Sequence, residues 1–567
     1  MELCLFFLQI VGSGQKGKSI VRYGPELALA WTLDINERYK GKKLFRCEAG
    51  REWLALQFSR NNNWLWLSWD NQSCGMAVIN KQELDILKEL RAKTHPISGA
   101  IKSHLVGGFL VQAFQINRDR VIAIEFSRPL GAGVNVSRFL VFEATGRQAN
   151  LIILDDKQKI MEVAKHIHPE INRYRSVLPG LFYTPPPPFE GPDLEIFSKN
   201  DLANITKYRG IGQPLAKFLL KEWELRNLDL EPYLKGLYSI TLQELICQEI
   251  DDYLTAFPLP LSGSRGEGKS PLESSKKLLD QYFERERHKM LEQIYKILDV
   301  KRHKIINKIK GLSALLSNVE EAEKWSHYGT LLISYAHKVK DGAPFACLKS
   351  WDERYGRVEI KLDPKLSPIE NAKKYFKLAK KYQRNEEKLS KEMEKLKNAL
   401  NELDEYREFV SMLNDVSDVK KILDDLSSDV RSKGSRKSGD YVPPYKRLDL
   451  KDGFIVYVGL NAKGNRHVTF KIASPEDLWF HAKDVTGAHV ILKLSGKLAN
   501  EKMINFAASL AAYYSKAKEA SYHVVDYTQR KHVKSLPKTG PGHVTYSDFS
   551  STRVSPGLWL ELLEELQ

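Results

Sequence analysis

The spacing of hydrophobic positions divides the chain into segments of different structure. A helical pattern begins at Pro25, because proline suits the first turn of a helix. From about Lys43 apolar and polar residues alternate instead, which predicts β-strands. Strands are expected at residues 53–58, 64–69, 110–116, 121–126, 138–143 and 150–155, and helices at 81–92 and 98–106. The first part of the chain is therefore predicted to mix strands and helices.

Two later segments repeat hydrophobic residues at intervals of three and four, with charged residues between them. They are Leu291, Ile294, Leu298, Ile305, Ile309, Leu312 and Leu316, and then Leu389, Met393, Leu396, Leu400 and Leu403. The simplest arrangement is an antiparallel coiled-coil arm with a small element, residues 326–368, at its far end. Strands are expected in that element at 331–334 and 358–362. An arm of about 40 residues spans roughly 60 Å. A dimerising coiled coil is the alternative arrangement.

The last part of the chain has the pattern of a compact α/β domain. It follows a basic Ser/Gly/Pro segment, which predicts a linker. Strands are expected at 453–459, 468–470, 478–480, 490–492, 523–527 and 544–546, a turn at 461–465, and helices at 501–518 and 558–566. Its central stretch, Asp477 to His489, places aromatic residues, histidines and a lysine at strand edges, with no nucleophile or phosphate loop nearby. That combination favours binding over bond-making.

These patterns predict an α+β multidomain protein. The expected segments are a mixed N-terminal domain (1–190), a helix-hairpin-helix region (191–265), the coiled-coil arm (266–430), a linker (431–444) and the C-terminal α/β domain (445–567).

Composition limits the kinds of binding partner and the cellular compartment that are expected. A formal net charge of +16 favours a polyanion such as nucleic acid or an anionic membrane. The five cysteines are scattered and form no CxxC, so neither structural zinc nor a disulfide framework is expected, and a cytoplasmic protein fits best. No apolar run reaches the length of a membrane span. Leu3 to Val11 lacks the basic start and the cleavage site of a signal peptide.

One segment near the start resembles a phosphate-binding loop. Gly12 to Ser19 matches the pattern GxxxxGK[ST], which would make the chain a P-loop nucleotide hydrolase. Such a loop requires a helix that begins at its Lys-Ser end. Gly24-Pro25 ends any such helix after about one turn. Nucleotide hydrolysis is therefore the weaker alternative.

Three turns carry distinctive residues. Asp119 and Arg120 fall at the tip of a predicted hairpin, and Arg147 falls in the next turn. Gly210 and Gly212 are typical of a helix-hairpin-helix, in which backbone amides approach a phosphate. The simpler alternatives remain open. Asp119 and Arg120 can form an ordinary turn with a weak surface ion pair, and the glycines can serve helix packing alone.

Many of these motifs, in the same order, resemble the NFACT family, whose members also carry the older label fibronectin-binding protein. In the last domain the resemblance lies in residues 453–461, 465–470, 477–483, 487–490, Pro541, Gly542 and Tyr546. Upstream it lies in Asp119-Arg120, 146–151, 175–187, 210–212 and 363–376. The last domain thus resembles the RNA-associated domain of that family. Thr486 and Ala488 depart from it, since many members carry Pro and Ser there.

The resemblance implies a ribosome quality control factor. Such a protein binds the large ribosomal subunit, through rRNA and the stalk base, when peptidyl-tRNA obstructs it. It recruits tRNA, alanyl-tRNA in bacterial members, for untemplated alanine tailing that marks the stalled chain for degradation. Asp119 and Arg120 match the pair linked to tailing and tRNA engagement. A small RNA-binding protein assists.

The resemblance implies neither a cofactor nor catalysis by the protein itself. Peptide-bond chemistry stays with the ribosome. The N-terminal domain of the family resembles formamidopyrimidine-class DNA glycosylases, which use an N-terminal proline as nucleophile. Because this chain begins Met-Glu-Leu, glycosylase activity is not expected. A surface adhesin that binds fibronectin is the remaining alternative.

The RNA-associated domain holds further RNA-binding candidates. Trp479 is suited to stacking on an unpaired base and Lys483 to holding phosphate, with His481 and His489 nearby. Either Trp479 or Phe480 must pack inside, because alternate strand residues face opposite sides of a sheet. The histidines lack further ligands at metal spacing, so structural roles are expected for them.

Overall fold

The computed structural model describes residues 20–60, 62–91, 93–131, 133–266, 268–317, 320–431, 442–536 and 543–566. The segments 3–11 and 12–19, most of the predicted linker and Pro541-Gly542 lie outside these residues. The chain forms two compact units, Met1–Glu286 and Arg287–Gln567, which are described separately. Within the described ranges, no helix has the length and apolar character needed to cross a membrane.

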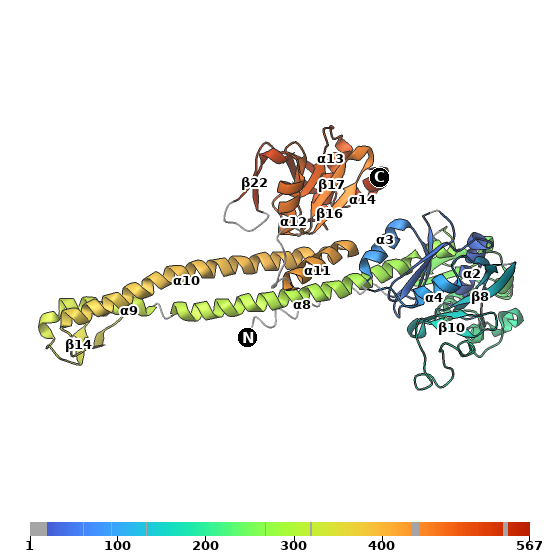
Figure 1. Cartoon of the computed structure of the whole chain (residues 1–567), viewed down its shortest axis with the longest axis horizontal. Helices are drawn as coiled ribbons and strands as arrows, with labels where there is room; N and C mark the ends of the chain where they lie inside the picture. Colours follow the sequence, from blue (N-terminus) through green and yellow to red (C-terminus); the bar gives the residue numbers. More distant parts are fainter. Residues whose placement is uncertain are drawn as a thin grey trace. The chain divides into compact units, whose positions relative to one another are not determined.

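The first unit contains two antiparallel sheets with helices against them (Figure 1). One sheet has the order β2-β3-β4-β5: β2 Arg46–Ala49, β3 Trp53–Gln57, β4 Trp64–Ser68 and β5 Gly75–Ile79. The other is a meander: β6 Phe109–Gln115, β7 Val121–Gly131, β8 Val134–Glu143, β9 Asn150–Leu154 and β10 Ile160–Val163. The helices are α2 Pro25–Tyr39, α3 Lys81–Leu90 and α4 Ile97–His104. The expected mixture of strands and helices is present, and every residue of β4 and β5 is buried.

A third sheet and a helical region complete this unit. The sheet has the order β1-β12-β11-β13: β1 Arg22–Tyr23, β12 Tyr253–Phe257, β11 Ile246–Ile250 and β13 Arg265–Gly266. The helical region contains a 3₁₀ helix at Lys199–Lys207, α5 Gln213–Arg226, α6 Glu231–Gly236 and α7 Pro271–Ser274. Strand β1 pairs in parallel with β12, which places residues 22–23 beside residues 253–254.

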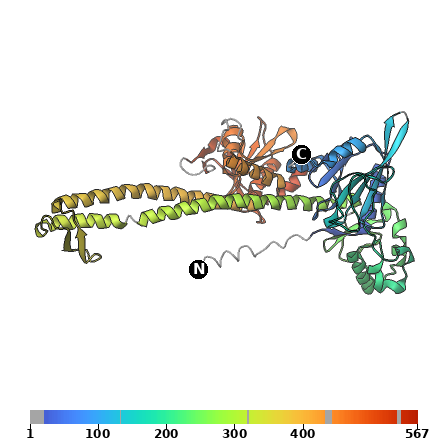
Figure 2. The same cartoon turned by 60° about the horizontal axis from the view of Figure 1, so that its bottom comes forward.

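The arm contains two long helices that lie side by side, as Figure 2 shows. Its elements are α8 Lys276–Ser317, α9 Glu320–Ser334, β14 Phe345–Lys349, β15 Arg357–Lys361, α10 Pro368–Ser411 and α11 Val416–Arg431. Two ion pairs give the antiparallel register: Arg302 lies 3.0 Å from Asp404, and Asp299 pairs with Arg407. Each helix therefore has its partner in the same chain.

The strand expected at 331–334 is wrong, because those residues belong to α9. Tyr328, Leu331 and Leu332 follow a helical spacing and pack against Tyr375 of α10 and the β14–β15 hairpin. A short apolar run is compatible with both a helix and a strand, so its pattern alone could not distinguish between them.

The C-terminal domain is built on a six-stranded antiparallel sheet in the order β16-β17-β19-β18-β20-β23. These strands are β16 Tyr445–Asp449, β17 Ile455–Gly459, β19 Val490–Lys493, β18 Leu478–Ala482, β20 His523–Gln529 and β23 Ser550–Val554. A small two-stranded sheet is formed by β21 Val533–Ser535 and β22 Val544–Tyr546. The helices are α12 Ala462–His467, α13 Glu501–Tyr513 and α14 Leu558–Leu566.

Two predictions in this domain are wrong. Residues 461–465 are not a simple turn, since α12 begins there and the Asn461 side chain caps it by accepting from the Gly464 N–H at 2.6 Å. Residues 468–470 are not a strand, since the helical path continues as a π-helical turn, Val468–Ile472. In addition, α13 ends at Tyr513 rather than at Lys518.

Helix α11 is joined to the C-terminal domain by a buried polar cluster. The Lys446 ammonium on β16 lies 3.2 Å from Asp418 and also pairs with Asp415. The Tyr514 hydroxyl donates to Asp418 at 2.6 Å. Because Asp418 is fully buried, these two partners compensate for only part of its lost hydration, and burial still raises the pKa of its carboxyl.

Candidate nucleic-acid interface

A cavity of about 430 Å³ in the first unit gathers residues from distant parts of the sequence. Its wall includes Asp119 and Arg120 of the β6–β7 hairpin together with Gly146, Gly210 and Gly212. Strand β1, the loop before β5 and Tyr253 of β12 complete it. Four of the predicted sites therefore meet at one place. The fifth candidate in this unit, Arg147, is exposed on a short 3₁₀ helix beside the cavity residue Gly146.

Asp119 and Arg120 do not form the weak surface ion pair that was one alternative. The Asp119 carboxylate instead accepts the backbone N–H of Arg120 at 2.7 Å, which braces the turn. The Asp119 carbonyl accepts from the Gln115 side chain at 2.7 Å. Neither side chain has a salt bridge to another residue in the ranges that the structure describes. The Arg120 guanidinium at the cavity wall is therefore open to an external anion.

The neighbouring Arg118, by contrast, is already engaged. Its guanidinium lies 2.9 Å from Asp193, forms a bidentate pair with Glu195, and stacks over the Tyr238 ring at 4.5 Å. Its hydrogen bonds lower the pKa of the Glu195 carboxyl. Arg118 thus fixes the hairpin to the segment before the 3₁₀ helix.

The two glycines serve packing, and the expectation that the Gly212 amide holds a phosphate is wrong. The Gly212 N–H donates to the buried Glu26 carboxylate at 2.9 Å. Tyr253 donates to the same carboxylate at 2.6 Å. A Cβ at Gly212 would lie 2.0 Å from the Tyr253 hydroxyl, so only glycine fits. Gly210 has φ +89°, a conformation that favours glycine, and packs against Tyr238.

The charge of the first cavity suits a polyanion. Arg22 and Arg120 line it beside one carboxylate, Asp119, while the charge of Arg118 is balanced by Asp193 and Glu195. Arg22 and Tyr23 were missed in the sequence, although they directly precede the helix at Pro25. Arg118 was also missed, although it adjoins the Asp119-Arg120 pair.

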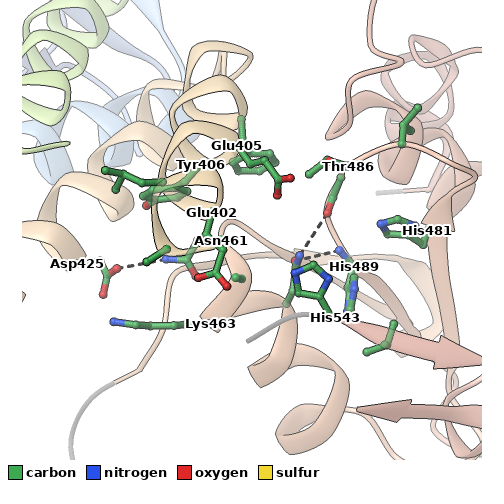
Figure 3. A pocket seen from close by; sticks show the side chains of 18 of the residues that line it. Glu402, Glu405, Tyr406, Asp425, Asn461, Lys463, His481, Thr486, His489 and His543 are labelled. Atoms are coloured by element: carbon green, nitrogen blue, oxygen red, sulfur yellow. Dashed lines mark hydrogen bonds between the residues drawn. The ribbon is translucent and has the colours of Figure 1, made fainter. Parts of the chain in front are cut away.

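A second cavity, of about 780 Å³, lies within the other unit (Figure 3). One wall belongs to the C-terminal domain and includes Trp479, His481 and His489. The opposite wall belongs to α10 and α11 and includes Glu402 and Asp425. The Asn461 side chain connects the two walls by donating to Asp425 at 3.2 Å. Three of the four candidates in the RNA-associated domain are therefore together, and Lys483 lies outside the cavity lining.

Trp479 and Phe480 are both fully buried, on opposite faces of β18. Phe480 stacks on Tyr527, and Trp479 lies against His481, His489 and Tyr546. The expectation that a base stacks on the face of Trp479 is therefore wrong, because its ring is covered. The edge of the indole ring can still form a hydrogen bond, since Nε1 has no partner in the described part of the chain.

Burial keeps the two cavity histidines neutral. Desolvation lowers the pKa of His481 to about 4, although the nearby Asp526 opposes the shift. Desolvation and the proximity of His481 hold the pKa of His489 well below 6.5. The Nδ1 of His489 lies 2.9 Å from the Thr469 hydroxyl, and its backbone N–H donates to Asn465 at 3.0 Å. These contacts fix the orientation of His489.

The same pKa shifts predict a loss of stability in acid. The unfolded chain takes up a proton at each histidine near pH 6.5, whereas folded His481 does so only near pH 4. Between these values the unfolded state binds more protons, so lowering the pH favours unfolding. His481 alone should cost about 1–2 kcal/mol between pH 7 and pH 5. Urea unfolding at both pH values measures this, and His481→Asn should flatten the dependence. An equally steep dependence in that variant would contradict the assignment.

Comparison with known proteins shows to which family this chain belongs. The family model of the NFACT N-terminal and middle domains matches residues 42–439. The chain belongs to the NFACT family. The model of the NFACT protein RNA binding domain matches residues 445–548, which include Trp479, His481 and His489.

Relatives of this chain are found in the bacteria Bacillus subtilis and Streptococcus pneumoniae. The chain is 29% identical over 489 residues to a protein named Rqc2 homolog RqcH from Bacillus subtilis (strain 168), covering 80% of this chain and 84% of that protein. A protein of the same name from Streptococcus pneumoniae serotype 2 (strain D39 / NCTC 7466) is 28% identical over 488 residues, with the same shares covered. The family match and these relatives support a role in ribosome quality control and RNA binding.

Two solved structures are also similar to parts of this NFACT chain. The C-terminal part of the fibronectin/fibrinogen-binding protein from Streptococcus suis covers 50% of this chain and 98% of its own, with 22% identity and a TM-score of 0.33. The N-terminal part of that protein covers 46% and 98%, with 19% identity and a TM-score of 0.37.

Proposed function

We propose that this NFACT chain binds the large ribosomal subunit obstructed by peptidyl-tRNA and recruits tRNA, alanyl-tRNA in particular. In this proposal it supports untemplated C-terminal alanine tailing of the stalled chain and so marks that chain for degradation. The protein acts in the cytoplasm as a binding factor rather than as an enzyme, because the ribosome itself forms the peptide bonds.

The observation that carries this proposal is the cavity of the first unit. It combines Arg22 and Arg120, which have no carboxylate partner in the described residues, with the half-buried ring of Tyr23. Guanidinium groups bind phosphate, and aromatic side chains accommodate unstacked bases, so the cavity suits a nucleotide from a tRNA loop.

The finer assignments belong to the same proposal. Residues 208–216 act as a helix-hairpin-helix through packing, and the N-terminal domain is related to formamidopyrimidine-class glycosylases in fold alone. The arm supplies the reach to the stalk base. A small RNA-binding protein assists cycling on the subunit.

Tagged purification followed by sequencing of the bound RNA tests this proposal. The expected result is large-subunit rRNA together with a narrow set of tRNAs dominated by those for alanine, enriched when stalled chains accumulate. Random RNA, released in parallel by a modest increase in salt, would contradict the proposal, because such release indicates only phosphate contacts.

The two alternatives predict different results. A P-loop hydrolase would bind nucleotide in a way that depends on Lys18, a residue outside the described ranges. A surface adhesin, as the fibronectin label suggests, would be found in the cell-surface fraction. Nucleotide binding lost in Lys18→Ala would favour the first alternative, and surface fractionation would favour the second.

A further inference from the structure

The cavity between the C-terminal domain and the α10–α11 wall has the size of a ligand site. Its volume of about 780 Å³ falls within the range of small-molecule sites, about 300–1,000 Å³. The wall from the C-terminal domain is rigid. Trp479 is fully buried, and His489 is held through both its ring and its backbone. Preformed walls of this kind reduce the entropic cost of binding.

The lining offers hydrogen bonds from planar, uncharged groups. The indole N–H of Trp479, the only hydrogen-bonding group of that side chain, has no partner in the described part of the chain. The His481 ring lies parallel to the indole, at an angle of 8° and a centroid distance of 5.7 Å. The His489 ring stands perpendicular to both. A buried donor without an acceptor costs free energy that a ligand can recover.

The charge of this cavity differs from that of the whole chain. Its lining contains four carboxylates and two lysines: Glu402, Glu405, Asp425, Asp484, Lys301 and Lys463. The chain as a whole carries a formal charge of +16. A phosphate would therefore be repelled from this cavity, while a neutral ring that carries hydrogen-bond donors and acceptors would be accepted.

We propose that this cavity binds a single unstacked nucleobase of an RNA, whose ring nitrogen or carbonyl oxygen accepts the Trp479 indole N–H. The carboxylates of Glu402 and Glu405 on α10 lie on the opposite wall, where they can accept from an amino group of the base (Figure 3). The phosphates stay outside the cavity, because its carboxylates repel them. This inference rests on the proposed role of the chain in RNA binding.

A nucleobase fits the observations better than a basic peptide. A lysine or arginine side chain would be attracted by the carboxylates, yet its cationic group has no lone pair, so a separate backbone carbonyl of the peptide would have to accept the indole N–H. A base edge presents acceptors and donors together, which matches both walls. The surrounding domain is also the one that the RNA-binding family model matches.

The test uses the full chain and two fluorescently labelled oligonucleotides of equal length, one an unstructured RNA and the other its abasic counterpart. The wild type is expected to bind the RNA more tightly than the abasic strand. Trp479→Phe keeps the ring but removes the donor, so it should weaken RNA binding roughly tenfold and leave abasic binding unchanged. Thr486→Trp, at an exposed position on the rim, should fill the cavity and give the same loss.

Trp559→Phe is the matched control. Trp559 is another buried tryptophan of the same domain whose Nε1 has no partner in the described residues, but it lies in α14 and does not line the cavity. This variant should bind both strands as the wild type does. Thermal unfolding shows whether each variant is folded.

Three outcomes would overturn the inference. The first is equal binding of both strands by the wild type. The second is an unchanged preference for RNA over the abasic strand in both folded cavity variants. The third is that Trp479→Phe abolishes binding of a labelled lysine-rich peptide while this variant still prefers RNA to the abasic strand. The oligonucleotide assay needs neither ribosomes nor tRNA. A failure to recover tRNA from cells would therefore refute the proposed function separately from this inference.

Discussion

The double variant Asp119→Ala/Arg120→Ala should still co-purify with large ribosomal subunits but should recover about tenfold less tRNA. The Arg120 guanidinium has no carboxylate partner in the described residues, so its removal deletes a phosphate contact without breaking an internal ion pair. The Asp119 carboxylate braces the turn by accepting the Arg120 N–H at 2.7 Å. Removing both side chains should therefore change the cavity wall and loosen the hairpin turn, while the buried core of the unit stays intact.

A second hairpin of the same sheet supplies the control. Asp156 and Lys157 are an exposed acidic and basic pair in the β9–β10 turn, outside the cavity. Asp156→Ala/Lys157→Ala should recover as much tRNA as the wild type. Equal recovery of tRNA by all three proteins would remove Asp119 and Arg120 from the tRNA site.

Arg175→Met should lower the free energy of unfolding of the first unit by about 3–5 kcal/mol. Arg175 and Glu143 are both buried, and the guanidinium binds both carboxylate oxygens, at 2.5 and 2.7 Å. The Tyr183 hydroxyl also donates to Glu143, at 2.9 Å. Without Arg175, the Glu143 carboxylate stays buried with too few partners, and its desolvation is no longer compensated.

Urea unfolding followed by tryptophan fluorescence measures this effect. Arg91→Met removes a half-exposed partner of Glu48 in the same unit and should change the free energy by less than about 1 kcal/mol. The double variant Glu143→Leu/Arg175→Met should recover part of the loss, because no unpaired charge remains buried. Similar midpoints for Arg175→Met and Arg91→Met would contradict this account of the buried pair.

Elements with long, regular patterns could be predicted from the sequence. The helix at Pro25 begins where the proline indicates, and the strands of both N-terminal sheets lie near their expected positions. Short apolar runs could not be assigned in this way. Residues 331–334 and 468–470 are helical because of neighbours that are distant in sequence, such as Tyr375 for the first run. A run of three or four apolar residues has no period to measure.

The candidate site residues could likewise be predicted only in part from the sequence. Asp119 and Arg120 stood out because a polar pair occupies a hairpin tip, and the structure brings them to a cavity wall. Their surroundings could not be foreseen, because β1 reaches the cavity only through parallel pairing with β12. The role of Gly212 also depended on Glu26 and Tyr253, which are distant from it in the sequence. Spacing along the chain carries no information on such contacts.

Mass spectrometry of stalled nascent chains tests the central claim most directly. A reporter without a stop codon is expressed in cells that lack this protein and in cells that carry either the wild type or Asp119→Ala/Arg120→Ala. The account predicts untemplated C-terminal alanine residues with the wild type only. Tails of the same length and abundance in all three strains, or no tails with the wild type, would contradict it.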